Sequence, residues 1–167
     1  MARKVFISFH YDPDNWRVQQ VLNIGAIEGE KTCSANEWEK IWRGGEAAVK
    51  SWIEKQLEGK SCLVVLVGAE TSRRPLVIYE IERAWNTGKG VVAVRIHGLL
   101  DRHQEQSSAG GNPLAELHFI SQPSKLLSSV AKLYDPPYST SQYVYAHITD
   151  NLDRWIEEAI EIRKNYQ

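Results

Sequence analysis

The sequence predicts a three-layer α/β fold around a central, mostly parallel sheet. Two apolar runs without polar alternation, residues 62–67 and 91–96, are typical of strands that are covered on both faces. Between them, a helical pattern opens at Pro75, where a proline has its φ preset and needs no amide partner. Strands that alternate with helices in this way predict a parallel sheet with right-handed crossovers.

The N-terminal part adds one strand and two helices to this pattern. Residues 4–9 are expected to form a short strand, followed by a loop over residues 10–14. Asp14 or Asn15 can cap the first helix, which runs to about Asn23. Residues 46–57 form the second helix, with Gly59 beyond its end. Residues 24–44 have the weakest pattern and are expected to hold an edge strand and a long loop.

The pattern is looser after His97. Residues 104–113 are polar and predict a mobile surface loop, and residues 114–133 are expected to include one further short strand. Thr149 or Asp150 is expected to cap the last helix. The whole chain, 1–167, is predicted to be a single domain with a core at about 3–101 and a variable C-terminal part, 102–167, that ends in this helix.

Composition excludes several classes of protein. The 167 residues have a formal net charge of −1, which leaves no general basic field for nucleic acid. No stretch approaches the roughly 18 apolar residues of a membrane span, and the N-terminus turns amphipathic too early for a signal peptide, so a cytoplasmic location is expected. Cys33 and Cys62 have no C-x-x-C spacing and are expected to be free thiols.

Several kinds of cofactor site lack their motifs. No glycine-rich phosphate loop follows any predicted strand, and Gly68 stands where a phosphorylated receiver needs an aspartate. Phe9 and His10 occupy the place of a flavodoxin-type Ser/Thr loop. The five histidines show no i, i+4 pairing, so no metal site is expected.

Glu80 is the acid that the predicted helix from Pro75 brings toward the sheet's carboxyl edge. In open α/β sheets, ligands bind in the crevice past the carboxyl ends of the strands. At 100° per residue, Glu80 lies on the flank of the apolar stripe together with Leu76 and Arg83. It is therefore either a crevice residue or a solvated glutamate paired with Arg83 or Arg74.

The combined motifs resemble a known family. They are the stretch 4–11 followed by Trp16-Arg17 and Val21, and the stretch 65–68 followed by Thr71, Arg74, Val77 and Tyr79-Glu80-Ile81. This combination resembles the small TIR-like proteins that include the signalling component of the Thoeris antiphage defence system. The similarity covers roughly residues 3–101, and residues 111–113 also fit. Two departures are Leu76, where tryptophan is common, and Leu22-Asn23, where an Arg-Asn pair is common.

The resemblance implies a flavodoxin-like TIR sheet and an enzyme that uses NAD as substrate, with no resident cofactor. Its product would be a cyclic ADP-ribose isomer that activates a separate effector protein after infection. Self-association is a further expectation.

Glu80 is the predicted catalytic residue. Cleavage of the nicotinamide glycosidic bond builds positive charge on the ribose, which a fixed carboxylate can stabilise. The helix start is expected to keep that carboxylate ionised.

The other candidates would bind the substrate. Phe9 and Tyr11 could stack on a base, although Phe9 could equally be core, and His10 either bonds the ligand or caps its loop. Arg74 could meet the pyrophosphate or pair with a nearby glutamate, either Glu70 or Glu80, and Trp38 could line the far wall.

Two other functions remain open at this point. A TIR-like fold also serves as a non-catalytic module that binds protein partners, and a nucleotide sensor would share the same pocket without turnover. An acid beside an aromatic pocket favours the enzyme, because a scaffold does not need it.

Overall fold

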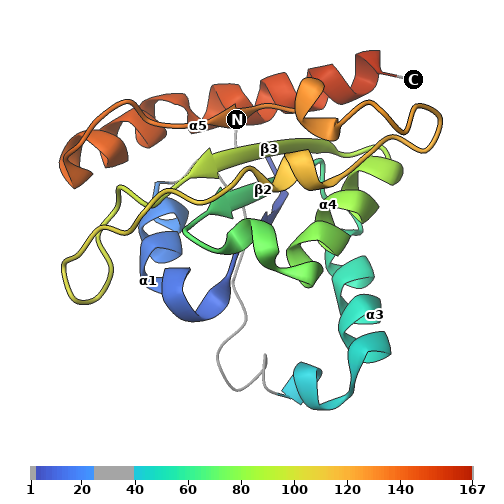
Figure 1. Ribbon diagram of the computed structural model, residues 1–167, viewed down its shortest axis with the longest axis horizontal. Coiled ribbons are helices and arrows are strands. Elements are labelled where there is room, and N and C mark those ends of the chain that lie inside the picture. Colours follow the sequence, from blue (N-terminus) through green and yellow to red (C-terminus); the bar gives the residue numbers. More distant parts are fainter. Residues whose placement is uncertain (1–2, 25–39, 167) are drawn as a thin grey trace.

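A computed structural model of the chain describes residues 3–24 and 40–166. Within this part, a four-stranded parallel sheet has the order β1-β2-β3-β4 (Figure 1). The strands are β1 (Val5–Ser8), β2 (Cys62–Val67), β3 (Gly90–Arg95) and β4 (Leu133–Tyr134). The first three are adjacent and parallel, as the sequence predicts. Cys33, Trp38 and most of the range 24–44, where an edge strand and a loop are predicted, fall in 25–39, outside the described residues. Residues 40–43, at the end of that range, are helical.

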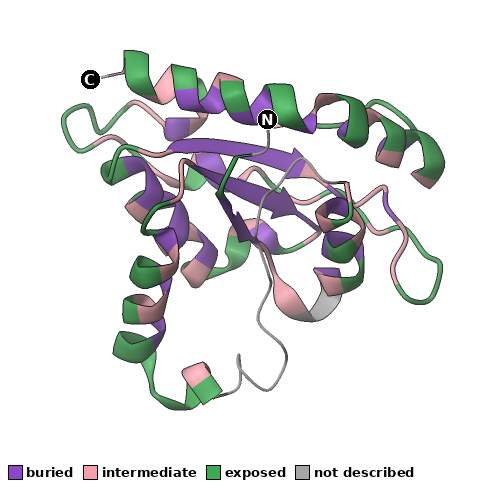
Figure 2. Ribbon diagram, turned by 180° about the vertical axis from the view of Figure 1, so that it is seen from behind, coloured by how far each residue is buried: buried purple, intermediate pink, exposed green. Residues whose placement is uncertain are grey.

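The strand register brings the carboxyl ends of the strands to one edge. Ser8 at the end of β1 is opposite Val65, and Val67 at the end of β2 is opposite Arg95. All six residues of β2 are buried, as are all four of β1, and these two strands are purple in Figure 2. Because both faces of these strands are covered, their sequences contain almost no polar residues.

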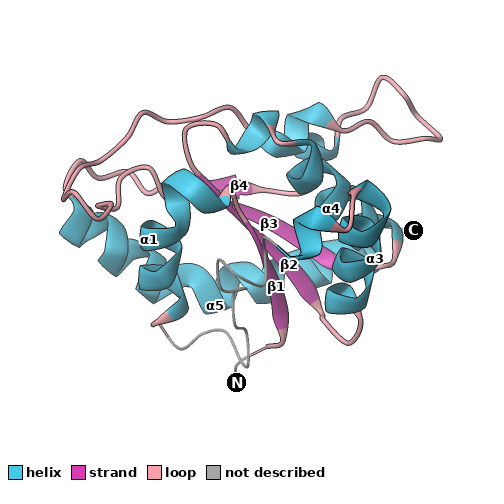
Figure 3. Cartoon of the chain, turned by 90° about the horizontal axis from the view of Figure 1, so that it is seen from below, coloured by secondary structure: helices cyan, strands magenta, loops and turns pink. Residues whose placement is uncertain are grey.

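Helices cover both faces of the sheet (Figure 3). On one face, α1 (Tyr11–Leu22) and α5 (Ser141–Asn165) pack against Val5, Ile7, Val64 and Val92. On the other, α3 (Glu46–Leu57) and α4 (Pro75–Asn86) pack against Phe6, Leu63, Val65 and Val91. The alternation of side chains along each strand thus divides the core into two layers. Among the helices of the described residues, none combines the length and the apolar character that a membrane crossing requires.

Two helix starts differ from the sequence prediction. α1 begins at Tyr11, with His10 at its N-cap, because the His10 carbonyl already accepts a hydrogen bond from the Asp14 amide at 3.3 Å. α5 begins at Ser141 instead of near residue 150, because Val144 and Ile148 continue its buried stripe toward the N-terminus.

Short 3-10 helices lie at the carboxyl edge and in the later part of the chain. They are η1 (Thr71–Arg73), η2 (Pro113–Glu116) and η3 (Leu127–Ser129). The predicted polar loop at 104–113 ends against the segment after β2: a Cβ at Gly110 would collide with the carbonyl oxygen of Gly68. Arg95 adds a hydrogen bond to the Gly110 carbonyl at 2.9 Å. The end of this loop therefore packs over the carboxyl edge of the sheet.

Candidate active site

Glu80 is buried in the layer between α4 and the sheet. Its exposed fraction is 6%, and it lies on the face of α4 that also buries Val77, Ile81 and Ala84. Glu80 has the flank position that periodicity predicts, but this flank is buried, because the covered face of α4 is wider than its apolar stripe. The expectation that the flank lies outside the core is therefore wrong, and so is the alternative of a solvated glutamate. Its Oε2 atom is buried without a hydrogen-bond partner among the described residues.

Arg83, the proposed partner of Glu80, faces the outer surface instead. Its Nε atom pairs with Glu54 of α3 at 3.1 Å, and the Tyr79 hydroxyl donates to the same carboxylate at 3.1 Å. These contacts join α3 to α4 at the rim of their interface. Glu80 is thus left without a cationic partner among the described side chains.

Burial raises the pKa of Glu80 to about 8, and the nearby Ser8 hydroxyl lowers it against this effect. The expectation that the helix start keeps Glu80 ionised is therefore not met. Glu80 is the sixth residue of α4, and the field of a helix terminus decreases within the first turn. Near neutral pH, the carboxyl group is mainly protonated in this structure.

Ser8 is a site residue that the sequence analysis missed. It ends β1 with an exposed fraction of 1%, and its Oγ atom completes no hydrogen bond among the described residues, although it lies near enough to Glu80 to lower that pKa. The signal in the sequence is a hydroxyl two residues after Phe6, which places it on the α3/α4 face of the sheet.

Phe9 and Tyr11 lie together at the carboxyl edge. Their rings are 5.9 Å apart and tilted by 35°, and both side chains are half-buried. Phe9 also packs against the core on the α1/α5 face, which supports its role in packing. Tyr11 is in the first turn of α1, not in a loop. The two rings form a short aromatic wall next to Ser8 in the chain.

The remaining predicted ligand residues have different positions. His10 is half-buried at the N-cap of α1, but its side chain makes no capping hydrogen bond. Arg74 is exposed at the N-cap of α4, and no described carboxylate, neither Glu70 nor Glu80, forms an ion pair with it. Arg74 therefore stays a candidate for binding an anionic group. Trp38 lies outside the described residues.

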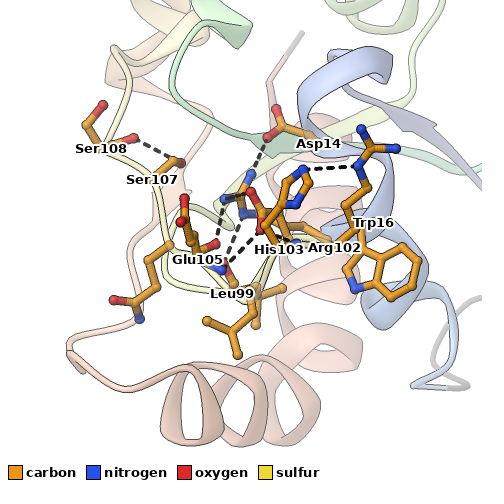
Figure 4. A network of polar contacts seen from close by, with 12 residues as sticks. Asp14, Trp16, Leu99, Arg102, His103, Glu105, Ser107 and Ser108 are labelled. Atoms are coloured by element: carbon orange, nitrogen blue, oxygen red, sulfur yellow. Dashed lines mark hydrogen bonds and ion pairs between the residues drawn. The ribbon is translucent and has the colours of Figure 1, made fainter.

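A second buried acid, Asp14, is on α1, which packs on the face of the sheet opposite to α4. Figure 4 shows Asp14 in a network of polar contacts. Asp14 is 1% exposed and Arg17 is 3% exposed, and Arg17 Nη1 pairs with Asp14 Oδ1 at 3.2 Å. Burial raises the pKa of Asp14, and the Arg17 charge lowers it against this effect. A Cβ at Gly68 would collide with the Asp14 carboxylate, so glycine at the end of β2 leaves room for this acid.

Arg17 also holds the segment after β3. Its Nε atom donates to the Leu99 carbonyl at 2.9 Å, and its Nη2 atom donates to the Glu105 carbonyl at 3.0 Å. Asp101 closes the same segment by accepting from the His103 and Glu105 amides. This network, drawn in Figure 4, ties α1 to residues 99–105 and was not predicted from the sequence.

The sequence that forms this candidate site can be compared with the sequences of known proteins. Residues 6–101, more than half of the chain, match the family described as Thoeris protein ThsB, TIR-like domain. The chain belongs to this family. The matched range contains β2, β3, α4 and all of β1 except Val5, and with them Ser8, Asp14 and Glu80. The α/β fold of this TIR-like protein agrees with the flavodoxin-like prediction.

A curated relative extends the comparison beyond the matched range. It is a Bacillus cereus (strain MSX-D12) protein with the provisional name cyclic ADP-D-ribose synthase ThsB1. The two chains are 31% identical over 124 residues, which are 71% of this TIR-like protein and 65% of the relative. The chain thus spans just under two thirds of the length of the relative.

The candidate site of this TIR-like protein can supply the carboxyl group of Glu80 and the hydroxyl of Ser8, both buried under α4. A buried glutamate without an ion-pair partner can respond to the charge of a ligand, because no described side chain already compensates it. Asp14 is different, since Arg17 already compensates its charge. Glu80 is therefore the stronger candidate for chemistry.

Proposed function

We propose that this TIR-like protein cleaves nicotinamide from NAD and joins the remaining ADP-ribose into a cyclic messenger. The observation that carries the proposal is Glu80, a buried carboxyl group without a cationic partner among the described residues, at the carboxyl edge of a parallel sheet. The name of the Bacillus cereus relative supports the same chemistry. In the reaction, the bond between ribose C1′ and the nicotinamide nitrogen breaks, and C1′ bonds to a nucleophile at the adenosine end, which loses a proton.

Glu80 would act in its ionised form. Cleavage creates oxocarbenium character on the ribose, and a carboxylate in a site of low polarity stabilises that charge strongly. Nicotinamide leaves as a neutral base, so the step needs no acid. The nicotinamide ring of bound NAD is cationic, and a cation near Glu80 lowers its pKa from about 8 and releases the proton.

Phe9 and Tyr11 would bind the substrate through their rings. Their half-buried aromatic wall suits stacking on a planar base, which would help to fold the adenosine end back toward C1′. Arg74 is exposed at the start of α4 and could donate two hydrogen bonds to the pyrophosphate. His10 and Trp38 remain proposed contacts, and no resident cofactor is part of this mechanism.

The messenger would act on a separate effector protein in antiphage defence, and the cytoplasm is the proposed compartment because it supplies NAD. Assembly with further copies of the chain is a related proposal. Light scattering of the purified protein, with and without NAD, would measure it.

The deciding experiment combines NAD with purified protein and, separately, with lysate from infected cells that express it. Mass spectrometry should detect nicotinamide and a product with the mass of ADP-ribose less water. The Glu80→Gln variant is the control, and it should give neither product. Equal product from wild type and Glu80→Gln in both samples would overturn the proposed role of Glu80, and absence of product in both wild-type samples would overturn the proposed activity.

A further inference from the structure

The end of β1 places a buried hydroxyl against the layer that contains Glu80. Ser8 pairs with Val65 of β2 in the parallel register, and Phe6 two residues earlier belongs to the core layer under α3 and α4. Because side chains alternate along a strand, Ser8 faces the same layer. The strand residues of this layer are mainly apolar, and they include Val65 and Val67.

Ser8 and Glu80 each have unused hydrogen-bonding capacity there. Ser8 Oγ and Glu80 Oε2 are both buried, and neither completes a hydrogen bond within residues 3–24 and 40–166. Buried polar groups in proteins are nearly always paired, so two open groups in one buried layer require an explanation. A mutual interaction between them supplies one, and it agrees with the lowering effect of the Ser8 hydroxyl on the pKa of Glu80.

A serine suits either protonation state of this glutamate. Its hydroxyl can donate to a carboxylate oxygen, and it can also accept from a protonated carboxyl group. A backbone amide or a lysine could only donate. When Glu80 loses its proton, the Ser8 hydroxyl can therefore change from acceptor to donor. It does so by rotating, without any movement of the strand.

The charged groups on the elements around Glu80 do not take this role. Those of α3 and α4 face the outer surface, where Arg83 pairs with Glu54 and Lys50 pairs with Glu46. Arg95 at the end of β3 is half-buried on the face of the sheet under α3 and α4, but it pairs with Asp135 at 3.1 Å and donates to the Gly110 carbonyl at 2.9 Å. The other charged side chains on α4, η1 and η2 and beside them are exposed, and they are Glu82, Glu70, Arg73, Arg74 and Glu116. Burial and Ser8 are the two causes that set the pKa of Glu80.

We propose that Ser8 is a positioning residue that holds the Glu80 carboxylate in its active orientation and favours its ionised form. The catalytic part of this inference rests on the proposed function of Glu80. The effect of the Ser8 hydroxyl on the pKa of Glu80 does not depend on turnover. Ser8 itself need not touch the substrate.

The first test measures the carboxyl group without any assay of activity. Full-length protein labelled with ¹³C at the glutamate carboxyl carbons is titrated across roughly pH 6–10, and the Glu80 signal is assigned by its loss in Glu80→Gln. In Ser8→Ala, we expect the pKa of Glu80 to rise above about 8, by about one pH unit, because the hydroxyl that can donate to the charged form is absent. Ser8→Thr keeps the hydroxyl and should restore the wild-type value.

The second test measures NAD consumption against pH. Since the ionised form is the active one, the rising limb of the profile should move to higher pH in Ser8→Ala, with about tenfold lower turnover near pH 7. Cys62→Ala is the matched control, because it also removes one heavy atom from a buried strand but lies in the α1/α5 layer. It should leave both the profile and the pKa of Glu80 unchanged.

The outcomes separate the two proposals. An unchanged Glu80 pKa in folded Ser8→Ala would overturn the role of Ser8, whatever the activity. A raised pKa without NAD turnover in wild type would retain the coupling and overturn the proposed function. If Ser8→Thr does not fold, Ser8→Cys has a weaker donor and should give a pKa between those of Ser8→Ala and wild type.

Discussion

The two faces of the sheet carry buried acids in different surroundings. Asp14, on the α1 face, is held by the Arg17 guanidinium, which also binds the carbonyls of Leu99 and Glu105. Glu80, on the α4 face, has no ionic partner among the described residues, and burial raises its pKa to about 8. An acid whose charge is compensated is held by its partner, whereas an acid whose charge is not compensated can respond to a ligand. The comparison supports a structural role for Asp14 and leaves Glu80 as the proposed catalytic group.

The largest expected effect is on stability at the Asp14 site. Arg17→Met leaves a buried carboxylate unpaired and should lower the free energy of unfolding by about 3–5 kcal/mol. Urea unfolding measures this loss. The exposed Arg154 is the matched control, and Arg154→Met should change stability by about 0.5 kcal/mol or less. Adding Asp14→Asn to Arg17→Met should recover part of the loss, and a double variant that is less stable still would contradict the ion-pair account.

Glu80→Gln should have the largest effect on activity. The loss of a charge that stabilises the transition state should lower NAD turnover by about 10²–10³-fold, with the fold retained. Nicotinamide release measures turnover, and the melting temperature of the same samples verifies folding. Glu82→Gln changes an exposed acid two residues away on α4 and should keep wild-type turnover. Equal activity of the two variants would assign Glu80 a structural role.

The stability of the wild-type protein should depend on pH through Glu80. In the unfolded chain this glutamate ionises near its ordinary pKa of 4.5, but the folded chain retains the proton until about pH 8. The unfolded state therefore binds fewer protons between these values, so the free energy of unfolding falls as pH rises through the window.

Glu80→Gln should remove this contribution, because glutamine does not titrate. At pH 8, the variant is expected to be more stable than wild type by on the order of a few kcal/mol. Chemical unfolding at about pH 5 and pH 8 measures the difference, with Glu82→Gln as the control. An identical pH dependence in wild type and Glu80→Gln would mean that the buried carboxyl group ionises at its ordinary pKa.

The smallest expected effects separate the two rings at the edge. Phe9→Ala should lower stability by roughly 1–2 kcal/mol, because Phe9 packs against the core on the α1/α5 face. Tyr11→Ala should weaken NAD binding by about 1–3 kcal/mol, by analogy with aromatic rings that hold nucleic-acid bases, and should lower the melting temperature less. Thermal unfolding and the KM for NAD of each variant test this. Equal destabilisation by both changes would place Tyr11 in the core.

The sequence alone was sufficient for the central strands and the helices beside them. A strand covered on both faces must be apolar throughout, so the run 62–67 could be recognised without a tertiary contact. The helix at Pro75 also started as predicted, because proline is favourable at a first helical position. Helix starts were predicted less well where no such residue marks them, as at Tyr11 and Ser141.

Only the tertiary structure decided the environment of the acids. Periodicity places Glu80 on a flank of α4, but the rotation of that helix against the sheet determines whether the flank is covered. The spacing of Asp14 and Arg17 is visible in the sequence, yet their burial depends on residues 99–105, which are about 80 positions later in the chain. Desolvation by such distant segments sets a pKa, and for that reason the protonation of Glu80 could not be predicted from local sequence.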